Sequence, residues 1–132
     1  MDRSRLERFP TLSGLDAGDL DAIASVASEL EVETGRELAA EGDFGHALFA
    51  IERGTAEVSR DGEVLRTLGP GDVFGEVAVL ASGRRTATVV ATTPMSLIAV
   101  FKRDVWALER RSPQAAGRLR ALVSERLAGQ TS

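Results

Sequence analysis

The 132-residue chain contains no cysteine, one histidine and one lysine. Without cysteine it has no disulfides, no thiolate nucleophile and no cysteine-based zinc site. The single histidine, His46, excludes a His-rich metal centre and disfavours a Ser-His-Asp triad. These absences predict that the protein is not an enzyme and carries no metal and no cofactor.

Long apolar runs are also missing, because none reaches the roughly 18 residues that a membrane span needs. The first residues lead into no signal-peptide core. We therefore expect a soluble, cytoplasmic protein without a membrane partner. The length predicts a single domain, 1–132, that buries roughly two-thirds of its unfolded surface.

Charge is distributed unevenly along the chain. Residues 1–101 hold 9 basic and 17 acidic side chains, whereas residues 102–132 hold 7 basic and 3 acidic ones. An acidic body binds polyanions poorly, because phosphate contacts dominate nucleic-acid affinity. No nucleic-acid partner is expected, and the C-terminal arginines, at helical spacing, are interpreted as a solvated helix face.

The first thirty residues, 1–30, are predicted to be helical, with an interruption at Pro10 and Gly14. Asp16 is a suitable N-cap for the following helix, and Asp19 places negative charge in its first turn. The apolar face of that helix has the i, i+3, i+4, i+7 spacing and comprises Leu20, Ile23, Ala24, Ala27 and Leu30.

Residues 31–101 have a different pattern, with glycines every few residues between short β-prone runs. Asp61-Gly62 predicts a two-residue hairpin turn, since a type I′ turn needs positive φ at both positions. Many short strands at this spacing predict an antiparallel β-roll of the jelly-roll barrel type. A single helical turn is expected within residues 74–80.

The helical period returns over residues 102–128 and predicts two C-terminal helices. The first ends near Arg111, and Ser112-Pro113 begins the second, because serine caps helices well and proline suits the first helical position. Trp106 is predicted to be a packing residue of the first of these helices. The fold class is therefore mostly β with flanking helices at both ends of the chain.

One stretch combines residues suited to a phosphate. Gly75 permits close backbone approach, and Glu76 starts a short helix whose first amides favour an anion. Arg85 follows, next to the hydroxyl of Thr86. An arginine, a hydroxyl and free amides suit one phosphate group, and the carboxylate beside it suits a ribose hydroxyl.

The order of these residues resembles a known family. The runs Phe74-Gly75-Glu76-Val77-Ala78-Val79-Leu80 and Arg85-Thr86-Ala87-Thr88-Val89, joined by Ala81-Ser82-Gly83-Arg84, look like the phosphate-binding cassette of cyclic nucleotide-binding domains. Leu68-Gly69-Pro70-Gly71-Asp72-Val73-Phe74 resembles the approach to that cassette, and Glu41-Gly42-Asp43-Phe44-Gly45 the family's early strands. The resemblance runs from about Leu6 to Leu127.

The resemblance implies a role for each matching residue. Glu76 accepts a hydrogen bond from the ribose 2′-hydroxyl, and Arg85 neutralises the phosphate of a 3′,5′-cyclic diester. The ligand-binding residues that it implies are Gly75, Glu76, Val77, Ala78, Arg85 and Thr86, within a cassette spanning 74–89. The two C-terminal helices are expected to act as a lid, with base-side contacts from Val73, Arg118, Leu119 and Leu122.

Two positions depart from the family's pattern. Arg84 stands where the family often has proline, so two arginines are adjacent, and in an extended segment only one faces inward. The register assigns that role to Arg85 and leaves Arg84 facing solvent. His46 stands, outside the cassette, where the family often has Asp or Asn.

The predicted function is a stand-alone regulatory module that binds a cyclic nucleotide and converts binding into movement of its C-terminal helices. Thr86 is compatible with both cAMP and cGMP. The arginine-rich, lysine-poor composition indicates a GC-rich bacterial genome, and a bacterial origin favours cAMP. The alternative is a member of the fold that has lost the nucleotide and acts as a protein-interaction module.

Other functions are disfavoured. A cupin-type metal oxygenase needs several histidines, and a DNA-binding regulator needs a helix-turn-helix that these 132 residues leave no room for. The downstream effector protein is unknown, and the apolar stripe of the last helix predicts a homodimer.

Overall fold

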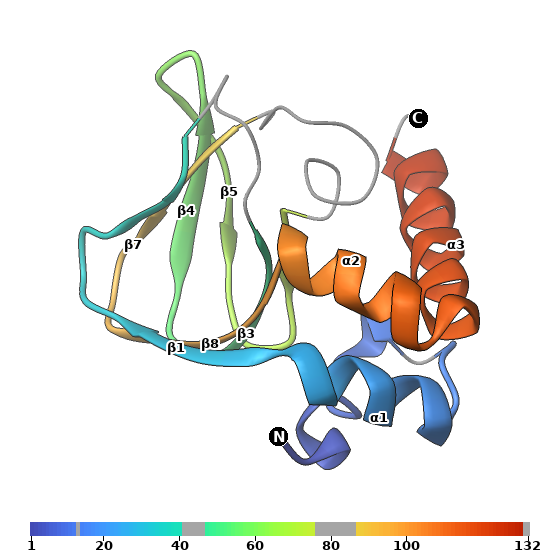
Figure 1. Cartoon of the computed structure of the whole chain (residues 1–132). Coiled ribbons are helices and arrows are strands. Elements are labelled where there is room, and N and C mark those ends of the chain that lie inside the picture. The colour runs from blue at the N-terminus through green and yellow to red at the C-terminus, as the bar shows by residue number, and fades with distance from the viewer. Residues whose placement is uncertain (13, 41–46, 76–86, 131–132) are drawn as a thin grey trace.

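The computed structural model describes residues 1–12, 14–40, 47–75 and 87–130, with side chains up to residue 121 except that of Thr11. Two antiparallel sheets form a roll, and the helices gather at one side of it (Figure 1). The elements are η1 (Arg3–Arg5), η2 (Pro10–Leu12), α1 (Ala17–Val26), β1 (Ser28–Val32), β2 (Glu37–Ala39), β3 (Ala47–Arg53), β4 (Ala56–Arg60), β5 (Glu63–Leu68), β6 (Val73–Phe74), β7 (Thr88–Ala91), β8 (Met95–Phe101), α2 (Lys102–Arg111) and α3 (Pro113–Gln130).

The strands form two four-stranded sheets, in the orders β1-β8-β3-β6 and β2-β7-β4-β5. Non-consecutive neighbours such as β8 and β3 show that the chain crosses repeatedly from one sheet to the other. Side chains of both sheets share one buried interior. The predicted jelly-roll-like architecture with flanking helices is therefore confirmed.

The first sheet is buried on both faces along β3, β6 and β8, whereas Glu29 and Glu31 of its edge strand β1 are exposed. Along β3, Phe49 and Ile51 point into the roll, whereas Leu48 and Ala50 point to the helices. The two faces must alternate because successive side chains of a strand point to opposite sides. This explains why β3 reads as an almost continuous apolar run and not as an alternating one.

The second sheet buries only its inner face. In β4, Ala56 and Val58 are buried while Glu57 between them is exposed. The strand at its edge, β5, is exposed from Glu63 to Thr67 and buries only Leu68. The contrast between the two sheets shows that the helices cover the first sheet alone.

Two corners of the roll depend on positive φ angles. Asp61 and Gly62 have φ of 53° and 78°, which confirms the predicted hairpin turn between β4 and β5. Gly54 has φ of 91°, and a Cβ placed there would lie 2.3 Å from the carbonyl oxygen of Pro94. Only glycine fits at this position, because both the backbone conformation and the neighbouring chain exclude a side chain.

The N-terminal helix is shorter than predicted. Asp16 caps it as expected, accepting a hydrogen bond from the Asp19 amide at 2.9 Å. The helix ends at Val26, and Leu30, which we expected on its apolar face, lies in β1 opposite Leu97 of β8. The assignment of 1–30 to helices was wrong at its end, because pairing with β8 outweighs a helical spacing that continues by coincidence.

The two C-terminal helices are confirmed, with their junction at Ser112-Pro113. The Ser112 carbonyl accepts a hydrogen bond from the Ala116 amide at 3.1 Å, so Pro113 is the first residue of α3 as predicted. The packing role expected for Trp106 was wrong, since its side chain is 53% exposed. The buried face of α2 is set by Val105 and Leu108, and Trp106 projects about 100° away from Val105.

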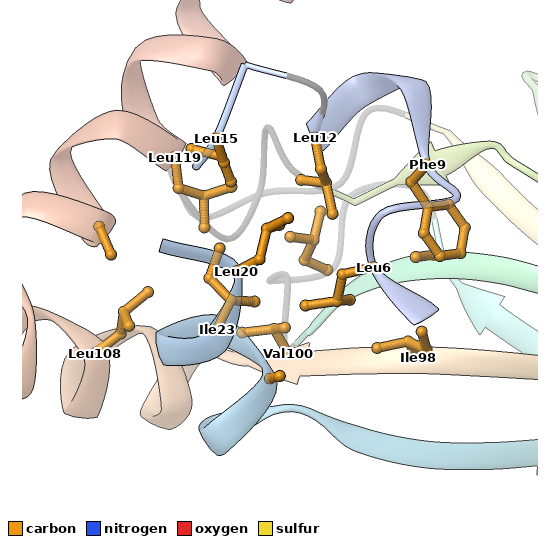
Figure 2. Packing of buried hydrophobic residues seen from close by; sticks show 14 of the residues in the cluster. Leu6, Phe9, Leu12, Leu15, Leu20, Ile23, Ile98, Val100, Leu108 and Leu119 are labelled. Atoms are coloured by element: carbon orange, nitrogen blue, oxygen red, sulfur yellow. The ribbon is translucent and has the colours of Figure 1, made fainter. Parts of the chain in front are cut away.

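The helices share one apolar cluster with the outer face of the first sheet, which we call the helical cluster (Figure 2). Leu6, Leu20 and Ile23 of the N-terminal segment point toward Val100 of β8 in this view. Leu108 of α2 and Leu119 of α3 belong to the same cluster. The three α-helices are therefore held to the roll and to each other by one continuous core.

Candidate functional site

The predicted cassette begins at β6, whose two residues face opposite ways. Phe74 belongs to the interior of the roll and packs on Phe49, with ring centroids 5.1 Å apart. Val73 belongs to the helical cluster. The start of the cassette is thus anchored to both hydrophobic cores at once.

A tight turn fixes the chain just before β6. The Asp72 carboxylate accepts a hydrogen bond from the Gly69 amide at 2.8 Å. The Ile51 amide donates to the Asp72 carbonyl at 2.9 Å, and the Gly71 amide donates back to Ile51 at 2.9 Å. These bonds attach the turn to β3 and determine where β6 starts.

Gly75 follows β6 with φ of 86°. This left-handed conformation costs other residues roughly 1–2 kcal/mol and costs glycine little. The backbone conformation therefore explains why glycine occupies the position where we predict close approach to a phosphate. Its contact with a ligand stays a prediction.

The other end of the cassette leads into β7, where Val89 points into the interior of the roll. β7 pairs with β2 and β4 of the second sheet, whereas β6 pairs with β3 of the first. The cassette therefore connects one sheet to the other, and buried side chains hold both of its ends.

The remaining predicted cassette residues, and the two departures from the family pattern, lie outside the described residues. Their roles stay predictions. They are Glu76, Val77, Ala78, Arg84, Arg85, Thr86 and His46.

The predicted base-side residues have different surroundings. Leu119 is buried in the helical cluster beside Leu15, and Val73 belongs to the same cluster (Figure 2). The Arg118 guanidinium donates to Asp19 Oδ1 at 2.6 Å. Leu122 lies in α3, and its side chain is outside the described ones. Contact of these residues with a base stays a prediction.

The ion pair between Arg118 and Asp19 was not predicted. The two residues are 99 positions apart. Local sequence predicts only that Asp19 lies in the first turn of a helix and that Arg118 lies on a solvated helix face. Arg118 also lies 3.6 Å from Asp16 Oδ2. No local pattern could have revealed this pairing, because it depends on how α3 is placed against α1.

A separate pocket of about 400 Å³ lies along η1, β1 and β3. Arg5 lines it and forms ion pairs with Glu52 and Glu29. The hydrogen bonds that its guanidinium donates to Glu52, and then to Glu29, raise the pKa of Arg5. The lining balances the guanidiniums of three arginines against three carboxylates, so it carries no excess of either charge; they are Arg5, Arg8, Arg53, Glu29, Glu31 and Glu52.

No group of three His, Cys, Asp or Glu side chains that could hold a metal ion occurs within residues 1–12, 14–40, 47–75 and 87–121. In the part of the chain that the structure describes, no helix has the length and apolar character to cross a membrane.

Comparison with known proteins decides the family. The profile of the cyclic nucleotide-binding domain matches residues 29–112, which include the whole predicted cassette. The chain belongs to the cyclic nucleotide-binding domain family. The resemblance carried by Phe74–Val89 is thereby confirmed for the family, and the domain is a cyclic nucleotide-binding regulatory domain.

Relatives of this domain include receptors and kinase regulatory subunits. The chain is 34% identical over 123 residues to the cyclic AMP receptor protein of Thermus thermophilus, covering 89% of this chain and 57% of that protein. It is 38% identical over 99 residues to the cAMP-dependent protein kinase regulatory subunit of Yarrowia lipolytica, covering 74% of this chain and 26% of that protein. The chain thus spans about half, or less, of these relatives' length.

Solved structures agree with the fold. The N-terminal domain of a transcriptional regulator from Streptomyces coelicolor A3(2) superposes with a TM-score of 0.79 at 30% identity, covering 95% of this chain and 93% of that one. The regulatory domain of Toxoplasma gondii PKA, crystallised with cAMP, superposes with a TM-score of 0.83 at 21% identity, covering 98% of this chain and 49% of that one. Both have the same roll and flanking helices.

Proposed function

We propose that this domain binds one cyclic nucleotide, cAMP in preference to cGMP, and signals by moving its C-terminal helices. The observation that carries the proposal is the family match over residues 29–112, with the cassette sequence from Phe74 to Val89 inside it. The preference for cAMP is supported by the relatives named as a cyclic AMP receptor and as cAMP-dependent kinase regulatory subunits.

The chemistry proposed for the site needs only residues that the cassette contains. Arg85 pairs with the single negative charge of the cyclic phosphate, and a guanidinium suits this because its fork donates two parallel hydrogen bonds. Glu76 accepts from the ribose 2′-hydroxyl. The Thr86 hydroxyl and the amides from Gly75 to Ala78 complete the cradle, and no metal or cofactor takes part.

Transmission to the helices is supported by the position of Val73. Its side chain is 3% exposed and lies in the cluster that contains Val105, Leu108 and Leu119. A ligand that draws the start of the cassette inward therefore changes the packing beneath α2 and α3. The ligand shifts this equilibrium only by its difference in affinity for the two arrangements.

Calorimetry of the chain with cAMP and with cGMP tests the proposal. We expect one nucleotide per chain and tighter binding of cAMP. Arg85→Ala is expected to weaken binding by roughly 10- to 100-fold, because a charged hydrogen bond is worth about 1.5–3 kcal/mol. Arg84→Ala is the matched control, since the same charge is removed one residue away, and it should leave affinity within about twofold.

Hydrogen exchange on the same samples tests the movement, because residues 103–128 should change protection when cAMP is added. Unchanged exchange at saturation contradicts the movement. If neither nucleotide binds at high micromolar concentration, the alternative is preferred, a module of this fold that binds another protein. Equal losses from Arg84→Ala and Arg85→Ala would contradict the assigned register.

A further inference from the structure

Asp19 is the only buried charged residue in the described part of the chain, at 4% exposure. Its Oδ1 accepts from the half-exposed Arg118 of α3 at 2.6 Å, and its Oδ2 has no hydrogen-bond partner. A buried carboxylate is costly unless it is paired. The position of Arg118 therefore determines whether Asp19 is tolerated where it lies.

A second aspartate shows what Asp19 does not do. Asp104 is the third residue of α2, and its carboxylate accepts from the Phe101 amide just before the helix, at 2.9 Å. Asp19 is the third residue of α1, where a carboxylate reaches the amide of the N-cap residue in the same way. Within the described residues, the one hydrogen bond of the Asp19 carboxylate comes from Arg118 of α3 instead.

The pair lies at the border of apolar packing between α1 and α3. Leu15, which precedes the N-cap of α1, lies against Leu119, which follows Arg118 in α3 (Figure 2). Leu15 and Leu119 thus form apolar packing beside the buried carboxylate of Asp19. The Arg118 side chain remains half-exposed to solvent. Separation of α3 from α1 breaks the pair and hydrates Asp19.

We propose that the Asp19–Arg118 pair is a latch that docks α3 on α1 and withholds Arg118 from the nucleotide. This inference rests on the proposed function and on the prediction that Arg118 is a base-side residue of the lid. Arg118 cannot donate to Asp19 and reach a nucleotide at the same time. In the released arrangement Asp19 has an alternative partner, the amide at its own helix start, as Asp104 has.

The docking part is tested without nucleotide, by hydrogen exchange of α3 residues 113–121. Arg118→Gln should speed exchange by about tenfold or more, because it leaves Asp19 buried and unpaired. Asp19→Asn should have a smaller effect, since Arg118 is then solvated. Adding Asp19→Asn to Arg118→Gln should recover part of the lost protection, and Arg118→Lys should retain most of it.

The matched control is Arg120→Gln, which removes the exposed ion pair between Arg120 and Glu109 of α2. It should change exchange by less than about twofold, as expected for a solvent-exposed pair. Equal effects of Arg118→Gln and Arg120→Gln, or strictly additive effects of the two latch substitutions, would overturn the docking role.

The regulatory part is tested by calorimetry with cAMP. Asp19→Asn should bind cAMP several-fold more tightly than the unsubstituted chain, because Arg118 is released. Arg118→Gln should show no such gain. Weaker or unchanged binding by Asp19→Asn overturns the latch, even where the domain binds cAMP well. If the unsubstituted chain binds neither nucleotide, the proposed function fails and the regulatory role with it, while exchange still decides the docking role.

Discussion

The interior of the roll and the helical cluster are both apolar, but different elements of the chain contribute their side chains. The interior is filled by alternate residues of strands in both sheets. The helical cluster combines the N-terminal segment, α1, α2 and α3 with the outer face of the first sheet. One core is therefore closed by strand pairing, whereas the other depends on helices from the two ends of the chain staying docked.

This difference places the proposed signalling on one side of the molecule. β6 contributes Phe74 to the interior and Val73 to the helical cluster. A change at the cassette therefore meets a roll of hydrogen-bonded strands on one side and the docked helices on the other. The helices are the part that can be displaced without breaking a strand ladder.

The largest expected effect comes from the interior. Ile51→Ala removes a fully buried side chain in the centre of the roll, where paired strands cannot collapse into the cavity. It should lower the free energy of unfolding by an amount near the upper end of about 2–5 kcal/mol. Denaturant unfolding measures this, and exchange should rise in every strand together. A loss confined to β3 would contradict a single cooperative interior.

A smaller and more local effect is expected from the helical cluster. Leu108→Ala removes a side chain with 1% exposure from α2. The loss should lie toward the lower end of about 2–5 kcal/mol, because docked helices shift to fill part of the cavity. Hydrogen exchange should rise in α2 and α3 while β4 and β7 keep their protection. Uniform loss of protection would show that the two cores unfold as one.

The smallest effect is expected at the uncovered sheet. Val64 of β5 is 55% exposed, and threonine retains its branched shape. Val64→Thr should change the free energy of unfolding by no more than about 0.5 kcal/mol. A thermal melt of this variant beside Ile51→Ala checks the contrast. A loss as large as that of Leu108→Ala would mean that β5 is covered in solution.

Much of the fold could be predicted from local patterns. The hairpin at Asp61-Gly62, the cap at Asp16 and the break at Ser112-Pro113 each depend on the conformational preferences of one or two residues, so they were predicted correctly. The end of α1 was not, because the spacing that includes Leu30 fits a helix as well as it fits the buried pattern of a strand. Trp106 was misplaced because a large apolar side chain gives no sign of which helix face becomes buried.

By itself, the sequence determined the family and the class of fold, and it predicts the chemistry of the site. These depend on which residue types follow one another along the chain, and the sequence contains that order directly. Only the tertiary structure decided that β3, β6 and β8 of the first sheet are buried on both faces and that Val73 and Phe74 enter different cores. It alone joined Asp19 to Arg118. Contacts between distant residues arise from the packing of whole elements, and no local preference of either residue specifies them.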